Sequence, residues 1–110
     1  MDYTVKITGE KRSNFRAQTL LLAKINGNLA GTVLDISASG ALLCTDSLFR
    51  MNDIVGIEIK LPNHNLMTSG RVVRIAGIER YGIEFINLSQ MDKINILHYI
   101  FRYCVKNKQT

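Results

Sequence analysis

Two short strings combine residue types that bind anionic nucleotides. The first is Arg12-Ser13-Asn14-Phe15-Arg16, an R-x-x-x-R preceded by Lys11, and the second is Asp35-Ile36-Ser37-Ala38-Ser39-Gly40, a D-x-S-x-x-G. Guanidinium groups bond phosphate oxygens and the O6 and N7 acceptors of guanine. A carboxylate accepts from the donors on the Watson–Crick edge of the same base. The two strings therefore predict a site for a guanine nucleotide and its phosphate.

Each residue of the two strings has an expected part in such a site. Arg12 and Arg16 are expected to bond phosphate or guanine, and Asp35 is expected to accept from guanine N1 and N2. Ser37 supplies a hydroxyl for phosphate, and Gly40 lets the backbone approach closely or take a positive φ. Either string alone is typical of a solvated charged surface or an Asx-type turn. Their occurrence together, in this order, favours the nucleotide.

The elements that must position these residues have the patterning of a small antiparallel barrel. Short apolar or alternating segments predict six strands, at residues 17–25, 29–36, 41–45, 54–61, 66–75 and 80–86. Asn26-Gly27 predicts a hairpin turn, and residues 62–65 predict another turn. This places Asp35 and Ser37 at a strand end on the rim of the sheet. Arg12 and Arg16 are expected in a loop that is free to move.

A change from strand to helix periodicity marks the C-terminal part of the chain. Ser89 is expected to be the N-cap of a helix, with Asp92 three residues later. A helix over about residues 89–106 is expected, with Ile94, Leu97, Phe101 and Cys104 on one face and Ile100 beside them. This face should cover an open side of the barrel. Residues 1–9 are expected to form an arm and residues 10–110 a single domain.

Composition and length limit the classes of function. A chain of 110 residues with 46% hydrophobic residues can bury a core as one globular domain. Its net charge of +5 attracts polyanions in general. Neither an export signal nor a membrane-length apolar stretch is visible, so a cytoplasmic protein is expected, with Cys44 and Cys104 reduced. His64 and His98 lack ligand-spaced partners, and no catalytic pairing is evident, so neither a metal, a cofactor nor an enzymatic activity is expected.

The paired strings resemble the PilZ domain family, whose pattern is an R-x-x-x-R in an N-terminal loop followed by D/N-x-S-x-x-G at a strand end. Residues 70–74 (Gly-Arg-Val-Val-Arg) and 81–85 (Tyr-Gly-Ile-Glu-Phe) are similar to late strands of the family, which also closes with a helix. The resemblance covers roughly residues 10–105. It implies an all-β fold with one C-terminal helix, namely a small six-stranded antiparallel split barrel covered by that helix. It also implies a bacterial receptor for the second messenger cyclic di-GMP.

The resemblance assigns a ligand site and a mode of action. The implied ligand-binding residues are Arg12, Arg16, Asp35, Ser37 and Gly40, with Lys11 and Gly82 as two further candidates. Binding is expected to close the N-terminal arginine loop onto the barrel and to change a surface offered to a separate downstream protein. Neither membrane insertion nor a nucleic-acid partner is expected. The protein is expected to be a monomer or a ligand-modulated dimer.

Two alternatives remain open from the sequence. One is a PilZ-like adaptor that acts through protein contacts without a nucleotide. The other is a small barrel that binds single-stranded nucleic acid, a class that uses exposed aromatic side chains as stacking platforms. The chain has no Trp, and only Tyr81 and Phe85 among its aromatic residues fall in predicted strands. Because so few aromatic residues fall in predicted strands, nucleic-acid binding is the weaker of the two hypotheses.

Overall fold

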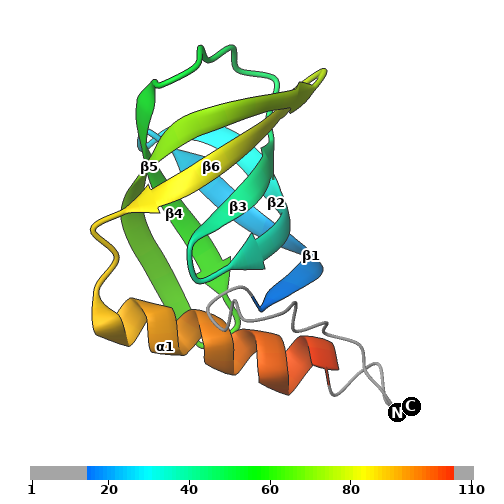
Figure 1. Cartoon of the computed structure of the whole chain (residues 1–110), viewed down its shortest axis with the longest axis vertical. Coiled ribbons are helices and arrows are strands. Elements are labelled where there is room, and N and C mark those ends of the chain that lie inside the picture. Colours follow the sequence, from blue (N-terminus) through cyan, green and yellow to red (C-terminus); the bar gives the residue numbers. More distant parts are fainter. Residues whose placement is uncertain (1–14, 106–110) are drawn as a thin grey trace.

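The protein forms a closed six-stranded barrel with a helix across one end (Figure 1). The computed structural model describes residues 15–105, and the side chains of residues 15–103. The strands are β1 (Arg16–Ile25), β2 (Leu29–Ser37), β3 (Gly40–Cys44), β4 (Ile54–Leu61), β5 (His64–Gly77) and β6 (Arg80–Ile86). Each strand is antiparallel to its neighbours, in the order β1-β2-β3-β6-β5-β4 around the barrel. The predicted six-stranded antiparallel barrel is confirmed.

Alternating side chains fill the barrel interior. In β4, the inward positions Val55, Ile57, Ile59 and Leu61 are buried and alternate with more exposed residues, as the period of two predicts. Fully buried aliphatic side chains from the other strands complete the interior; they are Ile25, Val33, Ile36, Leu43, Leu66 and Val72. Burial of this apolar surface is the main source of stability for a chain of this size.

Tight turns join most neighbouring strands, and they lie close to the predicted positions. Asn26 and Gly27 both have positive φ, 51° and 86°, as the hairpin between β1 and β2 requires. Asn26 also accepts from and donates to Gly56 on β4, at 2.8 Å in both directions, which fixes the hairpin tip. The predicted four-residue turn after β4 is shorter, because Leu61 pairs with His64 and β5 already begins there.

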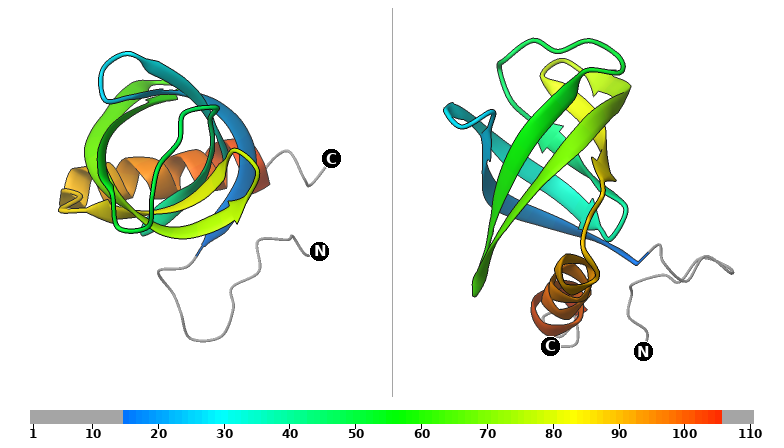
Figure 2. Two further views of the ribbon diagram at one scale, coloured as in Figure 1. Left: turned by 90° about the horizontal axis from the view of Figure 1, so that it is seen from above. Right: turned by 90° about the vertical axis from the view of Figure 1, so that its left-hand side faces the viewer.

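The helix α1 (Gln90–Tyr99) continues as a π-helical segment (Ile100–Val105) and crosses one end of the barrel (Figure 2). Ser89 is its N-cap, and the Ser89 Oγ accepts from the Asp92 N–H at 3.0 Å, as predicted. The predicted buried face is correct for Ile100, which is fully buried, but wrong for Ile94 and Phe101, which are half exposed. Ile96 and Tyr99 are buried against the barrel in their place, and the Cys104 side chain lies outside the described side chains.

The buried face of the helix is set by a different row of apolar and aromatic residues from the predicted one. Ile96, Tyr99, Ile100 and Tyr103 follow the i, i+3, i+4, i+7 spacing of one helical face. Tyr99 can lie in the core because its hydroxyl has a hydrogen-bond partner in the Thr19 side chain of β1. The stripe is easy to miss because two of its four members carry hydroxyl groups.

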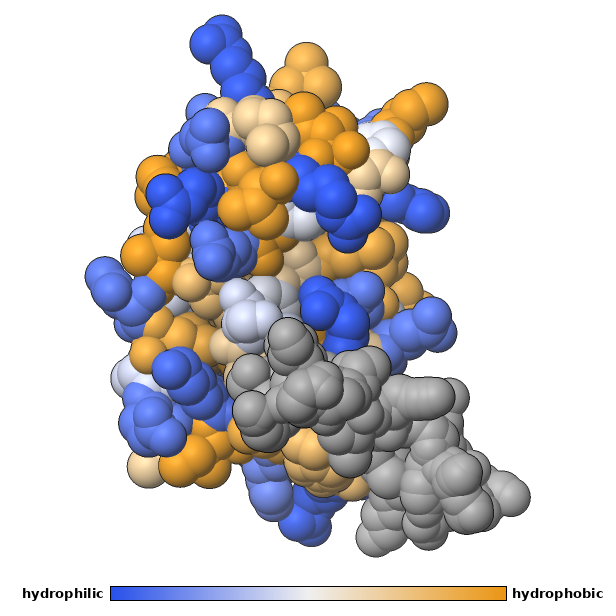
Figure 3. Space-filling view, viewed as in Figure 1, coloured by the Kyte–Doolittle hydropathy of each residue, from blue (hydrophilic) through white to orange (hydrophobic). Residues whose placement is uncertain are grey.

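Hydrophilic and hydrophobic residues are interspersed over the face of the barrel that Figure 3 shows, and three further observations on the described residues concern its chemistry. No helix among residues 15–105 is long and apolar enough to cross a bilayer. The same part of the chain has no cluster of three or more His, Cys, Asp or Glu side chains that could hold a metal ion. The Cys44 thiol is free and half-buried.

Candidate functional site

The two sequence strings meet in an ion pair. Arg16 is the second arginine of R-x-x-x-R, and its Nε lies 3.0 Å from Oδ1 of Asp35, the first residue of D-x-S-x-x-G. The Arg16 and Asp35 side chains are 48% and 25% exposed, so the pair is accessible from solvent. Since a guanidinium has five N–H donors, the terminal nitrogens of Arg16 have donors left for a further anion.

Arg16 was expected in a loop, but it is the first residue of β1. Its backbone is in register with Ser37 on β2, and this pairing holds the Arg16 side chain beside Asp35. The reason is that the β1–β2 ladder extends one residue beyond the predicted strand start. Arg16 is therefore part of the same framework as the second string. Lys11, Arg12 and the arm expected at residues 1–9 lie outside the described residues.

Ser37 is fully buried and shapes the turn between β2 and β3. Its Oγ accepts from the backbone N–H groups of Ser39 and Gly40, at 3.2 and 3.3 Å, and lies 3.1 Å from the Ser39 Oγ. These contacts use the side chain as an internal cap for the turn. The hydroxyl at the surface of this turn belongs to Ser39, a residue that the sequence analysis did not single out.

Gly40 is required by packing between strands. A Cβ at this position would lie 2.1 Å from the Ile83 carbonyl oxygen on β6. The predicted close approach of backbone is present, but it is an approach of β3 to β6. Gly40 does not have a positive φ, so conformational freedom is not the reason for this glycine.

The outer face of the barrel carries a row of four residues from neighbouring strands. Asp35 on β2 is in register with Leu42 on β3, Leu42 with Gly82 on β6, and Gly82 with Arg74 on β5. At roughly 4.8 Å per strand, the row extends for about 14 Å from Asp35 to Arg74. Its middle is low, because Gly82 has no side chain.

A shallow pocket of about 350 Å³ lies along this row. Its lining includes Arg16 at one side, Gly40 and Leu42 from β3, and Arg74 and Gly82 from β5 and β6. Gly82 was a candidate ligand residue, and the structure places it in the floor of the pocket. The sequence analysis missed Arg74, because a regular two-residue period places its side chain inside the barrel.

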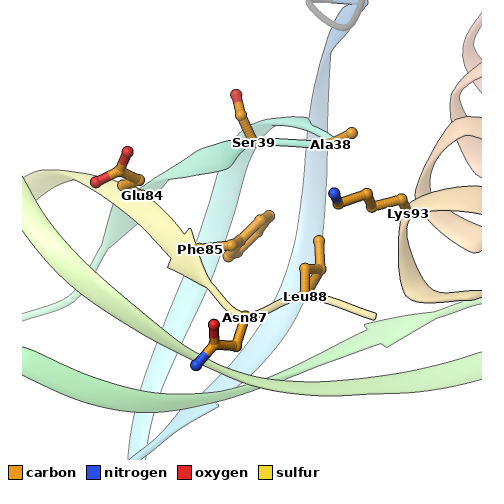
Figure 4. Close-up of a pocket in the computed structure, with 7 residues that line it drawn as sticks. All are labelled: Ala38, Ser39, Glu84, Phe85, Asn87, Leu88 and Lys93. Atoms are coloured by element: carbon orange, nitrogen blue, oxygen red, sulfur yellow. The ribbon is translucent and has the colours of Figure 1, made fainter. Parts of the chain in front are cut away.

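A second pocket of about 510 Å³ adjoins the first, and the two share Ser39 and Glu84 in their linings (Figure 4). It lies between the β2–β3 turn, the end of β6 and α1. Phe85 and Leu88 contribute apolar surface, and the Lys93 amine extends from α1 toward the turn. This lysine was also missed, since only the tertiary structure brings α1 beside the turn.

The aromatic side chains of the strands are not placed for stacking on bases. Tyr81 and Phe85 are both buried, 4% and 8% exposed, and belong to the core. Phe15, inside the first string, lies just before β1. It contacts Phe101 of the C-terminal helical segment edge-to-face, with ring centroids 4.7 Å apart.

Comparisons with known proteins agree with this architecture. Residues 10–102 match the PilZ domain family. The structure of the Bacillus subtilis inhibitor of motility, MotI/DgrA, is similar with a TM-score of 0.68 and 22% identity, covering 86% of this chain and 49% of that protein. The PilZ domain of CeSA from a cellulose-synthesizing bacterium is similar with a TM-score of 0.59 and 18% identity, covering 78% of this chain and 94% of that domain.

The structural similarities and the family match support different conclusions. The chain spans about half the length of MotI/DgrA. At identities of 22% and 18%, the two structures show a shared fold. No curated protein sequence matches the chain. The match to the family profile covers most of the chain and includes both strings.

Proposed function

The chain belongs to the PilZ domain family, and on this premise we propose that it is a non-enzymatic receptor for cyclic di-GMP. The family is generally one of regulatory domains that bind this dinucleotide. The observation that carries the proposal for this chain is the Arg16–Asp35 ion pair, because it joins the two motif strings at one accessible place. The adjoining pockets on the outer face of the barrel supply room beside that pair.

The ligand would meet complementary groups at this place. Each of its two phosphates carries a negative charge, and the remaining Arg16 donors can bond one of them. Asp35 has acceptor sites besides the one that Arg16 uses, and these can receive the N1 and N2 donors of guanine. The Ser39 hydroxyl lies at the edge of both pockets and can serve a phosphate. Ser37 contributes by holding the turn.

The proposed mechanism includes the N-terminal string. Arg12 and Lys11 would close over the bound dinucleotide, and the cost in conformational entropy would be offset by charge-assisted hydrogen bonds. The closed segment would change the surface that a downstream protein meets. Binding would thereby shift the population of a partner-competent state.

Isothermal titration with cyclic di-GMP tests the proposal. We expect the wild-type protein to bind, and Arg16→Ala to weaken binding by about 10- to 150-fold, since a hydrogen bond to a charged group contributes about 1.5–3 kcal/mol. Arg80→Ala is the matched control, because Arg80 is an exposed β6 residue outside both pockets. An absence of binding heat with wild-type protein at several temperatures would refute the proposal.

One observation favours the adaptor as a second candidate. Leu20 and Leu22 project from the outer face of β1, 79% and 65% exposed, as residues of a protein-contact surface do. A nucleotide-independent adaptor predicts no response to cyclic di-GMP, so the same titration separates the two candidates. Single-stranded nucleic acid is disfavoured by the buried Tyr81 and Phe85, and a salt-titrated gel shift tests it directly.

A further inference from the structure

Arg74 faces outward because of a β-bulge in β5. Val72 is in register with Ile83 and Arg74 with Gly82, so β5 has one extra residue, Val73, between two adjacent residues of β6. Val72 is fully buried, and regular alternation would turn Arg74 inward as well. The bulge instead leaves both Val73 and Arg74 on the outer face. Bulges of this kind re-aim side chains and are frequent next to functional sites.

The opposite strand leaves space for the Arg74 side chain. A Cβ placed on Gly82 would lie 3.2 Å from the Arg74 Cβ, 3.3 Å from its Nε and 3.7 Å from its Nη2. The guanidinium therefore extends over Gly82 and toward the middle of the row, where any larger residue would crowd it. The bulge and the glycine act on the same side chain from two different strands.

Arg74 also differs from neighbouring arginines in its pairing. Arg16 forms an ion pair with Asp35, and Arg71 forms one with Glu84, in which the Arg71 Nε lies 3.8 Å from the Glu84 Oε1. Within the described part of the chain, Arg74 has no ion pair. Its positive charge is thus not neutralised by a carboxylate of the barrel.

The surroundings of Arg74 fit a base better than a phosphate. Leu42 and Val73, with Val73 43% exposed, contribute aliphatic surface to the lining of the pocket, which also includes Glu84. A planar purine can cover such side chains with its face while a guanidinium meets its edge. Guanine has two adjacent acceptors, O6 and N7, that match the two parallel donors of a guanidinium, whereas adenine has a donor in place of O6.

We propose that Arg74 is a third ligand-binding arginine, which bonds the O6 and N7 atoms of one guanine of cyclic di-GMP and so sets selectivity against cyclic di-AMP. This inference rests on the proposed function. It adds to the two motif strings a residue that neither of them contains. The guanine that Arg74 bonds lies over Leu42 and Gly82, in the middle of the row between Asp35 and Arg74.

Titration of both dinucleotides into four proteins tests the inference. For Arg74→Ala we expect affinity for cyclic di-GMP to fall by about 5- to 150-fold, the effect of one good bidentate guanine contact. Affinity for cyclic di-AMP should change less, so that the selectivity ratio falls. Arg74→Lys should resemble Arg74→Ala, since a lysine keeps the charge without the planar fork. Arg80→Ala, the charge-matched control, should retain wild-type affinity and selectivity.

A double-mutant cycle tests the part played by Gly82. Gly82→Ala should displace the Arg74 side chain and weaken cyclic di-GMP binding in the wild-type background. In the Arg74→Ala background the same substitution should add little further loss, because the side chain that it displaces is already absent. Fully additive losses would contradict the packing argument. Thermal melts of all variants confirm that each is folded.

The possible outcomes distinguish a failure of the role proposed for Arg74 from a failure of the proposed function. If wild-type protein binds cyclic di-GMP and Arg74→Ala binds it equally well, the inference fails and the proposed function stands. The guanine assignment would also be overturned if Arg74→Ala lost affinity for the two dinucleotides equally. Wild-type affinity of Arg74→Lys for cyclic di-GMP would overturn it as well. If wild-type protein binds neither dinucleotide, the proposed function fails and the inference with it.

Discussion

Substitution of Gly40 by alanine distinguishes a packing role for this glycine from a ligand-binding role. The added Cβ would lie 2.1 Å from the Ile83 carbonyl oxygen, whereas ordinary van der Waals contact begins near 3.4 Å. The obstructing atom is backbone, so β3 and β6 would have to part by more than about 1 Å at the Gly40–Glu84 pair. Overpacking of this kind costs about 1–3 kcal/mol, and disruption of the ladder adds to it.

The assay is thermal and urea unfolding of Gly40→Ala beside a matched control. At about 4–8 °C per kcal/mol, the Tm of Gly40→Ala should fall by about 5–20 °C. Gly56→Ala makes the same chemical change on β4, where the nearest atom to the new Cβ is the Asn26 Oδ1 at 3.8 Å. We expect its stability to stay within about 1 kcal/mol of wild type, since ordinary backbone angles tolerate alanine.

One result would refute the reasoning. If Gly40→Ala unfolds like Gly56→Ala and yet loses binding of cyclic di-GMP, then Gly40 serves the ligand and not the contact between β3 and β6. If Gly40→Ala is destabilised and cyclic di-GMP restores part of the lost Tm, the variant still binds and the packing role stands. The second result follows from linkage, because a ligand of the native state raises its stability.

Two further substitutions test the turn and the helix. Ser37→Ala should destabilise the protein by about 1–3 kcal/mol in urea unfolding, because the buried Gly40 N–H loses its acceptor. Ser69 is exposed, so the control Ser69→Ala should change the free energy of unfolding by less than about 0.5 kcal/mol. Ile96→Ala should cost about 2–5 kcal/mol, since Ile96 is fully buried against the barrel, whereas Ile94→Ala, at a position that is 49% exposed, should cost much less; equal costs would contradict the observed orientation of the helix.

Much of the fold could be predicted from local patterns. The strands at 54–61 and 80–86 have the predicted bounds, because a clean period of two is a direct consequence of strand geometry. Asn26-Gly27 forms the predicted turn, since both residues tolerate a positive φ. The orientation of the helix could not be predicted in the same way. Its buried stripe includes Tyr99, whose hydroxyl is hydrogen-bonded to the Thr19 side chain of β1, 80 residues earlier in the chain.

The candidate site divides along the same line. Residue types and their order along the chain predicted that Arg16 and Asp35 belong to one site, because their chemistry is complementary to a guanine nucleotide whatever the fold. The ion pair between them is consistent with that prediction. Only the tertiary structure decided how they meet, through the β1–β2 register that pairs Arg16 with Ser37. Register depends on contacts between strands, and a shift of one residue would turn every side chain to the other face.

The sequence by itself determined the class of the fold, the family and the two motif strings, because alternation, turn residues and residue chemistry are local properties of the chain. The tertiary structure decided the parts of Ser37, Ser39 and Arg74. Ser37 became internal to its turn, Ser39 took the surface position, and a bulge brought Arg74 to the outer face across Gly82. Each of these outcomes depends on which strand lies opposite and in which register, and such pairings exist only once the barrel has closed.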